Sequence, residues 1–245
     1  MTEVRPLSTL EEFTTAVRLQ KEIWGFEDLE LLPLRLFVVA TKVGGLCWGA
    51  FDGDRMIGFC IAIPGLKPGG RTYWHSHMMG VVAEHRNTGV GRALKLRQRE
   101  DAIERGIELI EWTFDPLEIK NAYFNIERLG AVVRRYVLNQ YGTTTSHLHG
   151  DLPTDRCVAE WWISSPRVNG LLSGAPLERP HIETRIEVPF DIEVLRKREA
   201  ARAREIQRRV SQEFVSHFHN GLLVAGVERT RRAGVYLLAR DEEER

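Results

Sequence analysis

The sequence predicts an α/β fold. Short runs rich in β-branched and aromatic residues recur along the chain, and they alternate with longer segments whose apolar residues repeat at helical spacing. Near residue 90 a strand pattern passes through a glycine turn directly into a helix pattern. At 245 residues, with 43% hydrophobic and 28% charged side chains, the chain can bury a full core, as one large domain or two small ones.

The first 63 residues predict a strand, two helices and a β-hairpin. Ser8, with Glu11 three residues later, forms a capping box for the first helix, and Pro33 suits the first turn of the second. Apolar runs on either side of Asp52-Gly53-Asp54 predict the hairpin. The expected elements lie at residues 4–7, 8–22, 33–43, 46–51 and 56–63.

Strands and helices continue to alternate up to residue 163. Residues 64–70 are rich in glycine and proline and predict a loop, whereas Gly106 and Gly130 suit helix C-caps. Strands are expected at residues 73–83, 107–114, 131–138 and 157–163, and helices at 91–105 and 117–129.

The C-terminal third predicts a separate β-α-β-β extension. Prolines and glycines within residues 166–180 are typical of a linker. A strand, a long helix with an apolar stripe over residues 191–219, and two short apolar runs follow. We therefore expect a domain at 1–165, a linker at 166–180 and an extension at 181–245. The extension repeats the coarse order of residues 4–63, so a partial second lobe of the same kind is a hypothesis.

The glycine turn is the strongest functional signal. Met78 to Ala83 is a short apolar run, and Gly89 and Gly91 open the helix that follows. Glycine lets the backbone approach a ligand, and the amides at a helix N-terminus attract a phosphate or pyrophosphate. A dinucleotide-binding turn is the rival interpretation, but its third small residue would fall on the bulky Leu94.

Val81 followed by Arg86-Asn87-Thr88-Gly89-Val90-Gly91 resembles the acyl-CoA pyrophosphate loop of the GCN5-related N-acetyltransferases (GNAT), whose signature is Arg or Gln, two residues, Gly, one residue, and Gly or Ala. The resemblance covers about residues 1–165. It implies a mixed, mostly antiparallel central sheet flanked by helices, with acetyl-CoA or another short acyl-CoA as co-substrate. It also implies transfer of the acyl group to an amine of a small molecule or peptide by direct attack in a ternary complex.

The resemblance places the cofactor along the strand end and the loop. Backbone groups of the strand end would pair with the pantetheine arm, and the loop amides would hold the pyrophosphate. The expected cofactor-binding residues are Val81, Val82, Arg86, Asn87, Thr88, Gly89, Val90, Gly91, Arg92, Asn121 and Asn125.

His75 and His77 are the candidate bases. They alternate along one strand, so both side chains can reach the same cleft, and imidazole titrates near neutral pH. Their spacing to the loop also resembles arylalkylamine N-acetyltransferase, which implies a base role for His77 with His75 behind it. The alternative is that both are hydrogen-bonded strand residues.

The candidate acid is Tyr123. In the family a tyrosine often stands four residues before the glycine that ends the later helix, and this sequence has Ile126 there. Tyr123 is the nearby substitute, if the helix turns it toward the sulfur. A CoA thiolate can also leave unaided.

The acceptor site is expected to use acidic and aromatic side chains. Glu111 and Asp115 share one face of a strand and could bind a cationic acceptor, although Asp115 could equally cap the following helix. Trp24 and Phe37 lie on the two early helices that wall the acceptor site in such enzymes. Either aromatic could instead belong to the core.

Composition argues against several other classes. The 34 basic and 34 acidic residues cancel, so no nucleic-acid partner is expected. No apolar run is long enough for a membrane span and the N-terminus has no leader pattern, so we expect no membrane partner and a cytoplasmic location. The three cysteines have no CxxC spacing and are expected to be buried thiols.

Two further function classes stay open. HxH occurs at 75/77, 147/149 and 217/219, but no cysteine or carboxylate stands at motif spacing, so we expect no metal. Without the tyrosine, the protein could bind acyl-CoA as a non-catalytic sensor or assembly partner. The resemblance also makes a homodimer a candidate state.

Overall fold

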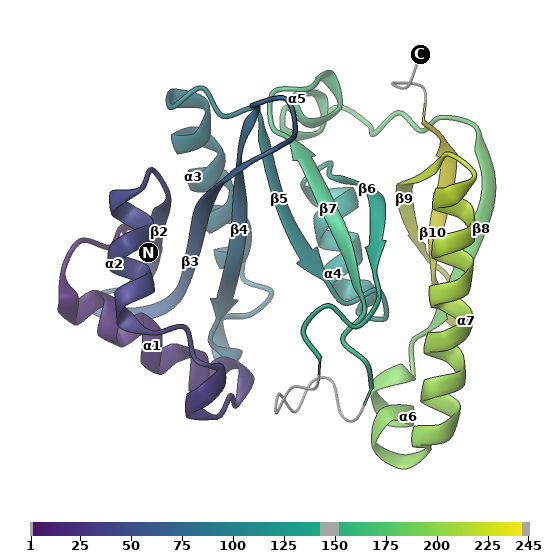
Figure 1. The fold of residues 1–245 in the computed structure, drawn as a ribbon, viewed down its shortest axis with the longest axis horizontal. Coiled ribbons are helices and arrows are strands. Elements are labelled where there is room, and N and C mark those ends of the chain that lie inside the picture. The colour runs from purple at the N-terminus through teal and green to yellow at the C-terminus, as the bar shows by residue number, and fades with distance from the viewer. Residues whose placement is uncertain (1, 143–151, 242–245) are drawn as a thin grey trace. The chain divides into compact units, whose positions relative to one another are not determined.

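The computed structural model describes residues 2–142 and 152–241 (Figure 1). These residues form two compact units, residues 2–111 and residues 112–142 with 152–241, and strand β5 (Leu109–Phe114) crosses from one to the other. The expected α/β class is confirmed: the sheet is mixed, mostly antiparallel and flanked by helices, and additional C-terminal strands are present. The proposed division into a domain, a linker and an extension stays a prediction.

The first unit holds four complete strands, the start of β5 and three α-helices. The strands lie in the order β1-β2-β3-β4-β5; neighbours from β1 to β4 are antiparallel, and β4 and β5 are parallel. The elements are β1 (Thr2–Pro6), α1 (Leu10–Trp24), α2 (Leu34–Lys42), β2 (Leu46–Asp52), β3 (Arg55–Leu66), β4 (Thr72–Val81) and α3 (Val90–Glu104), with 3-10 turns at Asp28–Glu30 and Ala83–His85.

The capping box of α1 is present, one residue later than expected. Thr9 is the N-cap, its side chain accepts a hydrogen bond from the amide of Glu12, and the Glu12 carboxylate accepts from the amides of Ser8 and Thr9. The expected pair of Ser8 and Glu11 is therefore wrong. Both registers fit the sequence pattern, and the extended backbone of Thr9 selects the observed one.

Helices α1 and α3 cover opposite faces of β4. A Cβ atom on Gly80 would lie 2.5 Å from Cη2 of Trp24 in α1, so this glycine lets α1 approach the strand closely. The side chain of the preceding residue, Met79, lies beside Gly91 in α3. Because successive residues of a strand point to opposite faces, the sheet of the first unit is enclosed on both sides near the end of β4.

The second unit holds the end of β5 and five further strands, in the order β5-β7-β6-β9-β10-β8. Its elements are α4 (Ile119–Tyr123), a π-helix (Phe124–Arg128), β6 (Val132–Val137), β7 (Arg156–Trp162), α5 (Pro166–Leu172), β8 (Ile182–Pro189), α6 (Ile192–Arg198), α7 (Ala200–His219), β9 (Leu222–Arg229) and β10 (Ala233–Arg240).

Two helices of this unit differ from expectation. The segment expected to be a linker contains α5, which Ser165 caps by accepting from the amide of Val168. The single helix expected over residues 191–219 is two helices, because Glu199 has non-helical dihedral angles between α6 and α7.

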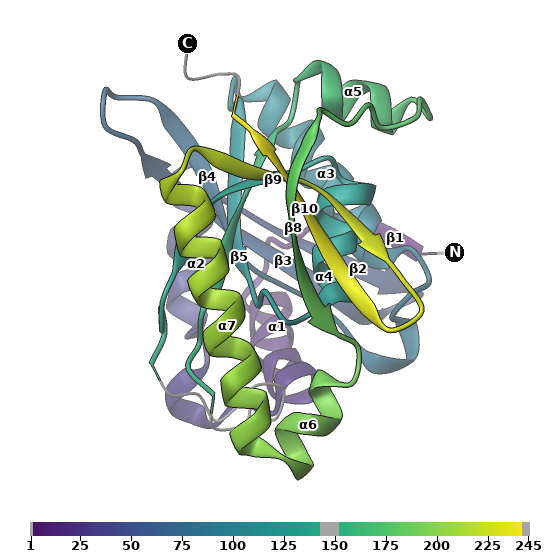
Figure 2. The same cartoon turned by 90° about the vertical axis from the view of Figure 1, so that its right-hand side faces the viewer.

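Helix α7 packs against β6, β8 and β9, and Figure 2 shows it running in the same general direction as β8. Phe214 of α7 is fully buried, and its ring lies 5.2 Å from Tyr136 of β6 and 5.0 Å from Tyr236 of β10. These contacts account for the apolar stripe that the sequence shows in this region.

The extension repeats the order of the N-terminal elements but not their pairing. β1 pairs with β2, the first strand of its hairpin, whereas β8 pairs with β10, the second strand of its hairpin. β9 then pairs with β6 at Val133 and Val224. The extension is therefore not a copy of the N-terminal arrangement.

Candidate functional site

The predicted cofactor loop ends in a helix N-terminus that no side chain caps. Gly89 is the N-cap of α3, with φ of +97°, and Asn87 also has a positive φ of 64°. The amide of Ala93 makes the first bond within the helix, to the carbonyl of Gly89. By helix geometry the amides of Val90, Gly91 and Arg92 have no partner inside the helix, and the helix dipole makes this end positive. The loop can therefore receive an anion.

The side chain of Arg86 holds this loop in position through hydrogen bonds to two backbone carbonyls. Its guanidinium donates to the carbonyl of Val81 at 3.1 Å and to the carbonyl of Ile23 at 3.2 Å. Its backbone amide donates to the carbonyl of Ala83. The signature arginine thus ties the loop to the end of β4 and to the end of α1, which is a positioning role that the sequence does not reveal.

The end of β4 presents alternate backbone groups to its two sides. The amide of Val82 donates to the carbonyl of Ile57, so Val82 and Gly80 face β3. The backbone groups of Val81 and Met79 point the other way. Of the two expected pantetheine partners, Val81 is thus oriented away from β3. Met79 is a candidate that sequence reasoning missed, although the two-residue period of a strand would have found it.

His75 and His77, hereafter the histidine pair, come together as expected. Their ring centroids lie 5.7 Å apart, and both side chains are partly buried. Burial lowers the pKa of His77 below the ordinary imidazole value. At neutral pH the His77 ring is therefore uncharged and can accept a proton.

Glu111 lies beside the histidine pair in the sheet of the first unit. His75 pairs with Glu111 across the parallel β4 and β5 strands. The Glu111 side chain is 3% exposed, and one of its oxygens accepts from Nζ of Lys67 at 2.6 Å. The carboxylate of Glu111, which was expected to bind a cationic acceptor, is therefore already paired with a lysine of the same chain.

Asp115, in the second unit, also has an internal cation. Arg196 of α6 donates to Asp115 at 2.7 Å and to Glu118 at 2.9 Å, and the amide of Leu117 donates to the other Asp115 oxygen. Burial and the Asp115 charge raise the pKa of Glu118, which Arg196 opposes. The capping alternative considered for Asp115 is wrong, because α4 begins at Ile119 with Glu118 as its N-cap and no side-chain cap; Asp115 instead accepts from Leu117 in the turn before the helix.

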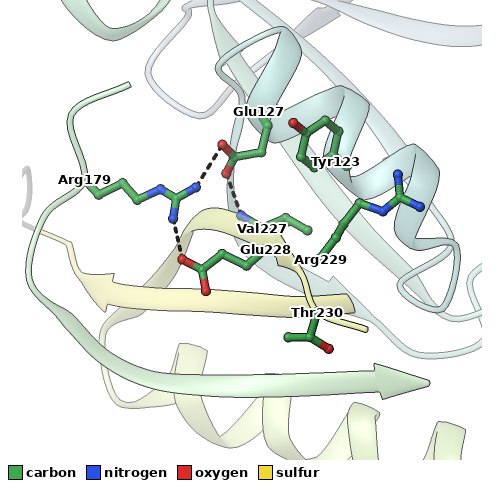
Figure 3. Close-up of a pocket in the computed structure, with 7 residues that line it drawn as sticks. All are labelled: Tyr123, Glu127, Arg179, Val227, Glu228, Arg229 and Thr230. Carbon is green, nitrogen blue, oxygen red and sulfur yellow. Dashed lines mark hydrogen bonds and ion pairs between the residues drawn. The ribbon is translucent and has the colours of Figure 1, made fainter. Parts of the chain in front are cut away.

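Tyr123 lines a pocket of about 450 Å³ in the second unit (Figure 3). Arg179 crosses this pocket, donating to Glu127 at 3.2 Å and to Glu228 at 2.7 Å, and Glu127 also accepts from the amide of Val227. The two carboxylates therefore share one arginine as their cationic partner.

The two asparagines expected at the cofactor differ in exposure. Asn121 is exposed, and Asn125 is 1% exposed and donates to the Asn121 side chain at 3.3 Å. Ile126, at the position of the usual tyrosine, is fully buried. These residues lie in the second unit, whereas the cofactor loop lies in the first.

The two aromatic candidates of the early helices, Phe37 and Trp24, lie in different environments. Phe37 is fully buried, with ring centroids of Phe13 at 6.1 Å and Phe59 at 6.0 Å, so it occupies the core, as the alternative for this residue held. Trp24 is only partly buried and stacks on Phe26 at 5.7 Å. Trp24 remains the candidate for an acceptor wall.

The structure adds a buried polar cluster that sequence reasoning missed. Lys95 and Gln98 of α3 and Ser76 of β4 are all buried and hydrogen-bonded to one another. The signal is present in the sequence, because Lys95 and Gln98 fall on the stripe of α3 that also carries Leu94 and Ala102.

The cysteines and histidines form no further site in the described part of the chain. Cys47, Cys60 and Cys157 are buried thiols, and burial raises the pKa of the first two to about 12. Within residues 2–142 and 152–241 no group of three His, Cys, Asp or Glu side chains could hold a metal ion. His147 and His149 lie outside the described residues.

No helix in the described ranges is both long and apolar enough to span a bilayer.

Comparison with known proteins relates part of the chain to a family of acetyltransferases. Residues 9–130 match the model of the acetyltransferase (GNAT) family. A search of the curated proteins found no match.

Solved structures share the fold at low sequence identity. The ribosomal-protein-S18-alanine N-acetyltransferase of Escherichia coli is 17% identical, with a TM-score of 0.52 over 67% of this chain and 96% of that one. The protein yncA of Salmonella typhimurium, solved with acetyl-CoA, is 13% identical, with a TM-score of 0.53 over 67% and 97% of the two chains. Aminoglycoside 6'-acetyltransferase type Ii is 18% identical, with a TM-score of 0.53 over 66% and 98%.

Proposed function

Residues 9–130 belong to the GNAT acetyltransferase family, and from that premise we propose that this chain transfers an acyl group from acetyl-CoA, or another short acyl-CoA, to an amine of a small molecule or peptide. The observation that carries the proposal is the uncapped N-terminus of α3 behind Gly89, held in place by Arg86. Such an end suits the pyrophosphate of CoA, because amides and helix dipole both favour an anion there.

The reaction needs a neutral amine close to the thioester. Direct attack forms a bond from the amine nitrogen to the carbonyl carbon, and the carbon–sulfur bond then breaks to release the CoA thiolate. His77 is the proposed base, because its lowered pKa keeps the imidazole neutral and able to take the proton from the amine. His75, whose ring centroid lies 5.7 Å from that of His77, is the proposed residue that passes this proton on through a water.

A non-catalytic acyl-CoA sensor is the second candidate. The observation that favours it is Ile126, which is fully buried at the position where the family often has its tyrosine acid. Tyr123, the substitute, lines the pocket crossed by Arg179 instead. A thiolate leaving group needs little acid assistance, so we rank the enzyme first.

The cofactor is tested by calorimetric titration of the metal-stripped protein with acetyl-CoA, with NADH and zinc as parallel ligands. We expect micromolar binding of acetyl-CoA alone. Gly89→Asp should weaken this binding by at least about tenfold, because a carboxylate would occupy the anion position. Binding of NADH or zinc without acetyl-CoA would contradict the proposal.

Gly106→Asp is the matched control. Gly106 stands at the other end of α3, also has a positive φ, of +68°, and a Cβ there meets no atom within 4 Å, as at Gly89. The Gly106→Asp variant should therefore bind acetyl-CoA like the wild type. Release of CoA with a panel of amines then separates the enzyme from the sensor: binding without any turnover favours the sensor.

A further inference from the structure

Lys95 lies in the interior of the first unit, where a lysine is rare. Its side chain projects from α3 toward the sheet and is 2% exposed. Nζ donates to Oγ of Ser76 at 2.9 Å and to Oε1 of Gln98 at 3.2 Å. Nε2 of Gln98 donates to the same serine oxygen at 3.1 Å. Both lone pairs of the hydroxyl are thus in use, which fixes the position of Ser76 against α3.

Ser76 occupies a special point of β4. Along the antiparallel β3 and β4 strands, Ile61 pairs with Met78 and Ala62 pairs with Ser76, so His77 is an extra residue that forms a β-bulge. Residue 76 faces α3, and its neighbour His75 faces the opposite side of the sheet. The bulge therefore decides where the ring of His77 lies relative to His75.

We propose that Lys95 is a positioning residue: through Ser76 it fixes the bulge of β4 and so holds the histidine pair in place. Helix α3 also begins at the cofactor loop, one and a half turns before Lys95. The same helix therefore orients both the anion-binding amides and the strand that carries the histidine pair. That the pair acts as a base rests on the proposed function, whereas its positioning by Lys95 does not.

The energetics of burial support this role. A buried polar group is destabilising unless it is hydrogen-bonded, so the hydrogen bonds among the three members offset the cost of burying them. Burial also lowers the pKa of Lys95 to about 7, with the thiol of Cys60 as the opposing electrostatic influence. An apolar side chain would fill the same space at a lower free-energy cost of burial. The lysine is therefore best explained by the polar contact it makes with Ser76.

The test is an NMR titration of the histidines, which needs no substrate. The full-length wild type is compared with Lys95→Met, Ser76→Ala and the double variant, and His77 is assigned from His77→Gln. If the anchor is lost, water reaches the bulge and the His77 ring is protonated more readily. We expect each single variant to raise the proton affinity of His77 at least threefold. The double variant should raise it no further than either single variant does.

Ser76→Ala separates positioning from charge. It keeps the lysine and removes only the anchor, so an unchanged His77 titration in Ser76→Ala overturns the proposal, even if Lys95→Met has an effect. Leu94→Ala is the control for stability, because Leu94 is fully buried in the same helix and lies outside the cluster. It should lower the melting temperature without changing the His77 titration, and an equal change there would also overturn the proposal.

This design keeps two failures apart. If the amine panel gives no turnover but both anchor variants change the His77 titration, the positioning inference stands and the acyl-transfer proposal fails. If turnover is found and His77 titrates alike in all variants, the reverse holds.

Discussion

Lys95→Met should remove a pH dependence from the stability of the protein. In the folded state burial lowers the pKa of Lys95 to about 7 from its usual 10.5. Between these two values the unfolded chain holds a proton on this side chain that the folded protein does not. Unfolding then takes up a proton, so the free energy of unfolding increases as pH rises through this window.

The magnitude follows from the two pKa values. Each pH unit over which only the unfolded state is protonated adds about 1.4 kcal/mol. Because the folded lysine is still half protonated at pH 7, the wild type should gain about 2 kcal/mol relative to Lys95→Met between pH 7 and pH 9. The window stops at pH 9, because Cys60 and Lys95 interact electrostatically, so ionisation of this buried thiol at higher pH would not cancel between the two proteins.

The assay is urea unfolding of both proteins at pH 7, 8 and 9, followed by circular dichroism and by tryptophan fluorescence. Coincident transitions establish that one cooperative step is measured. Groups common to both proteins cancel in the difference. A difference between the two free energies of unfolding that stays constant within about 0.5 kcal/mol would refute a buried lysine of low pKa.

Three further predictions concern other contacts. Arg196→Met removes a buried cation from Asp115 and should lower the free energy of unfolding by about 3 kcal/mol, measured by urea unfolding. Gly80→Ala places a methyl group 2.5 Å from Trp24 and should cost about 1–3 kcal/mol, measured in the same way. His77→Ala should lower the rate of CoA release at least about tenfold with an amine acceptor, most strongly at low pH, because the amine is mostly protonated there and must lose its proton before it attacks.

Each of these has its control. Arg202→Met breaks an exposed ion pair with Glu199 and should change stability by less than about 0.5 kcal/mol. Gly170→Ala adds a methyl group within α5 whose neighbour, Cβ of Ala175, lies 3.8 Å away, so it should be neutral or stabilising. Equal effects in a variant and its control would remove the structural explanation, and a His77→Ala profile that parallels the wild type would exclude His77 as the base.

The cofactor loop and its flanking elements were predictable because local patterns encode them. Glycine at positions 89 and 91 and the apolar run before them determine a strand, a turn and a helix with little help from the rest of the chain. The histidine pair followed from the two-residue period of a strand, although the bulge at His77 did not. A bulge depends on the register between two strands, which no local pattern contains.

Long-range partners were the part that the sequence left open. Three features depend on contacts between residues far apart in the chain. Arg86 reaches Ile23, Asp115 is paired with Arg196, and Phe37 lies in the core. The break at Glu199 likewise falls within a continuous helical pattern. Periodicity identifies the face of an element that is buried, but it does not identify the element that covers it.

The pairing of β6 with β9 has a consequence for the solubility of shorter forms of the chain. In the second unit β6 has β7 on one side and β9 on the other, joined at Val133 and Val224. Without residues 181–245, β6 would become a bare edge strand whose unpaired amides and carbonyls could template the strands of another molecule. By covering the edge of β6, the C-terminal extension should therefore reduce edge-to-edge aggregation.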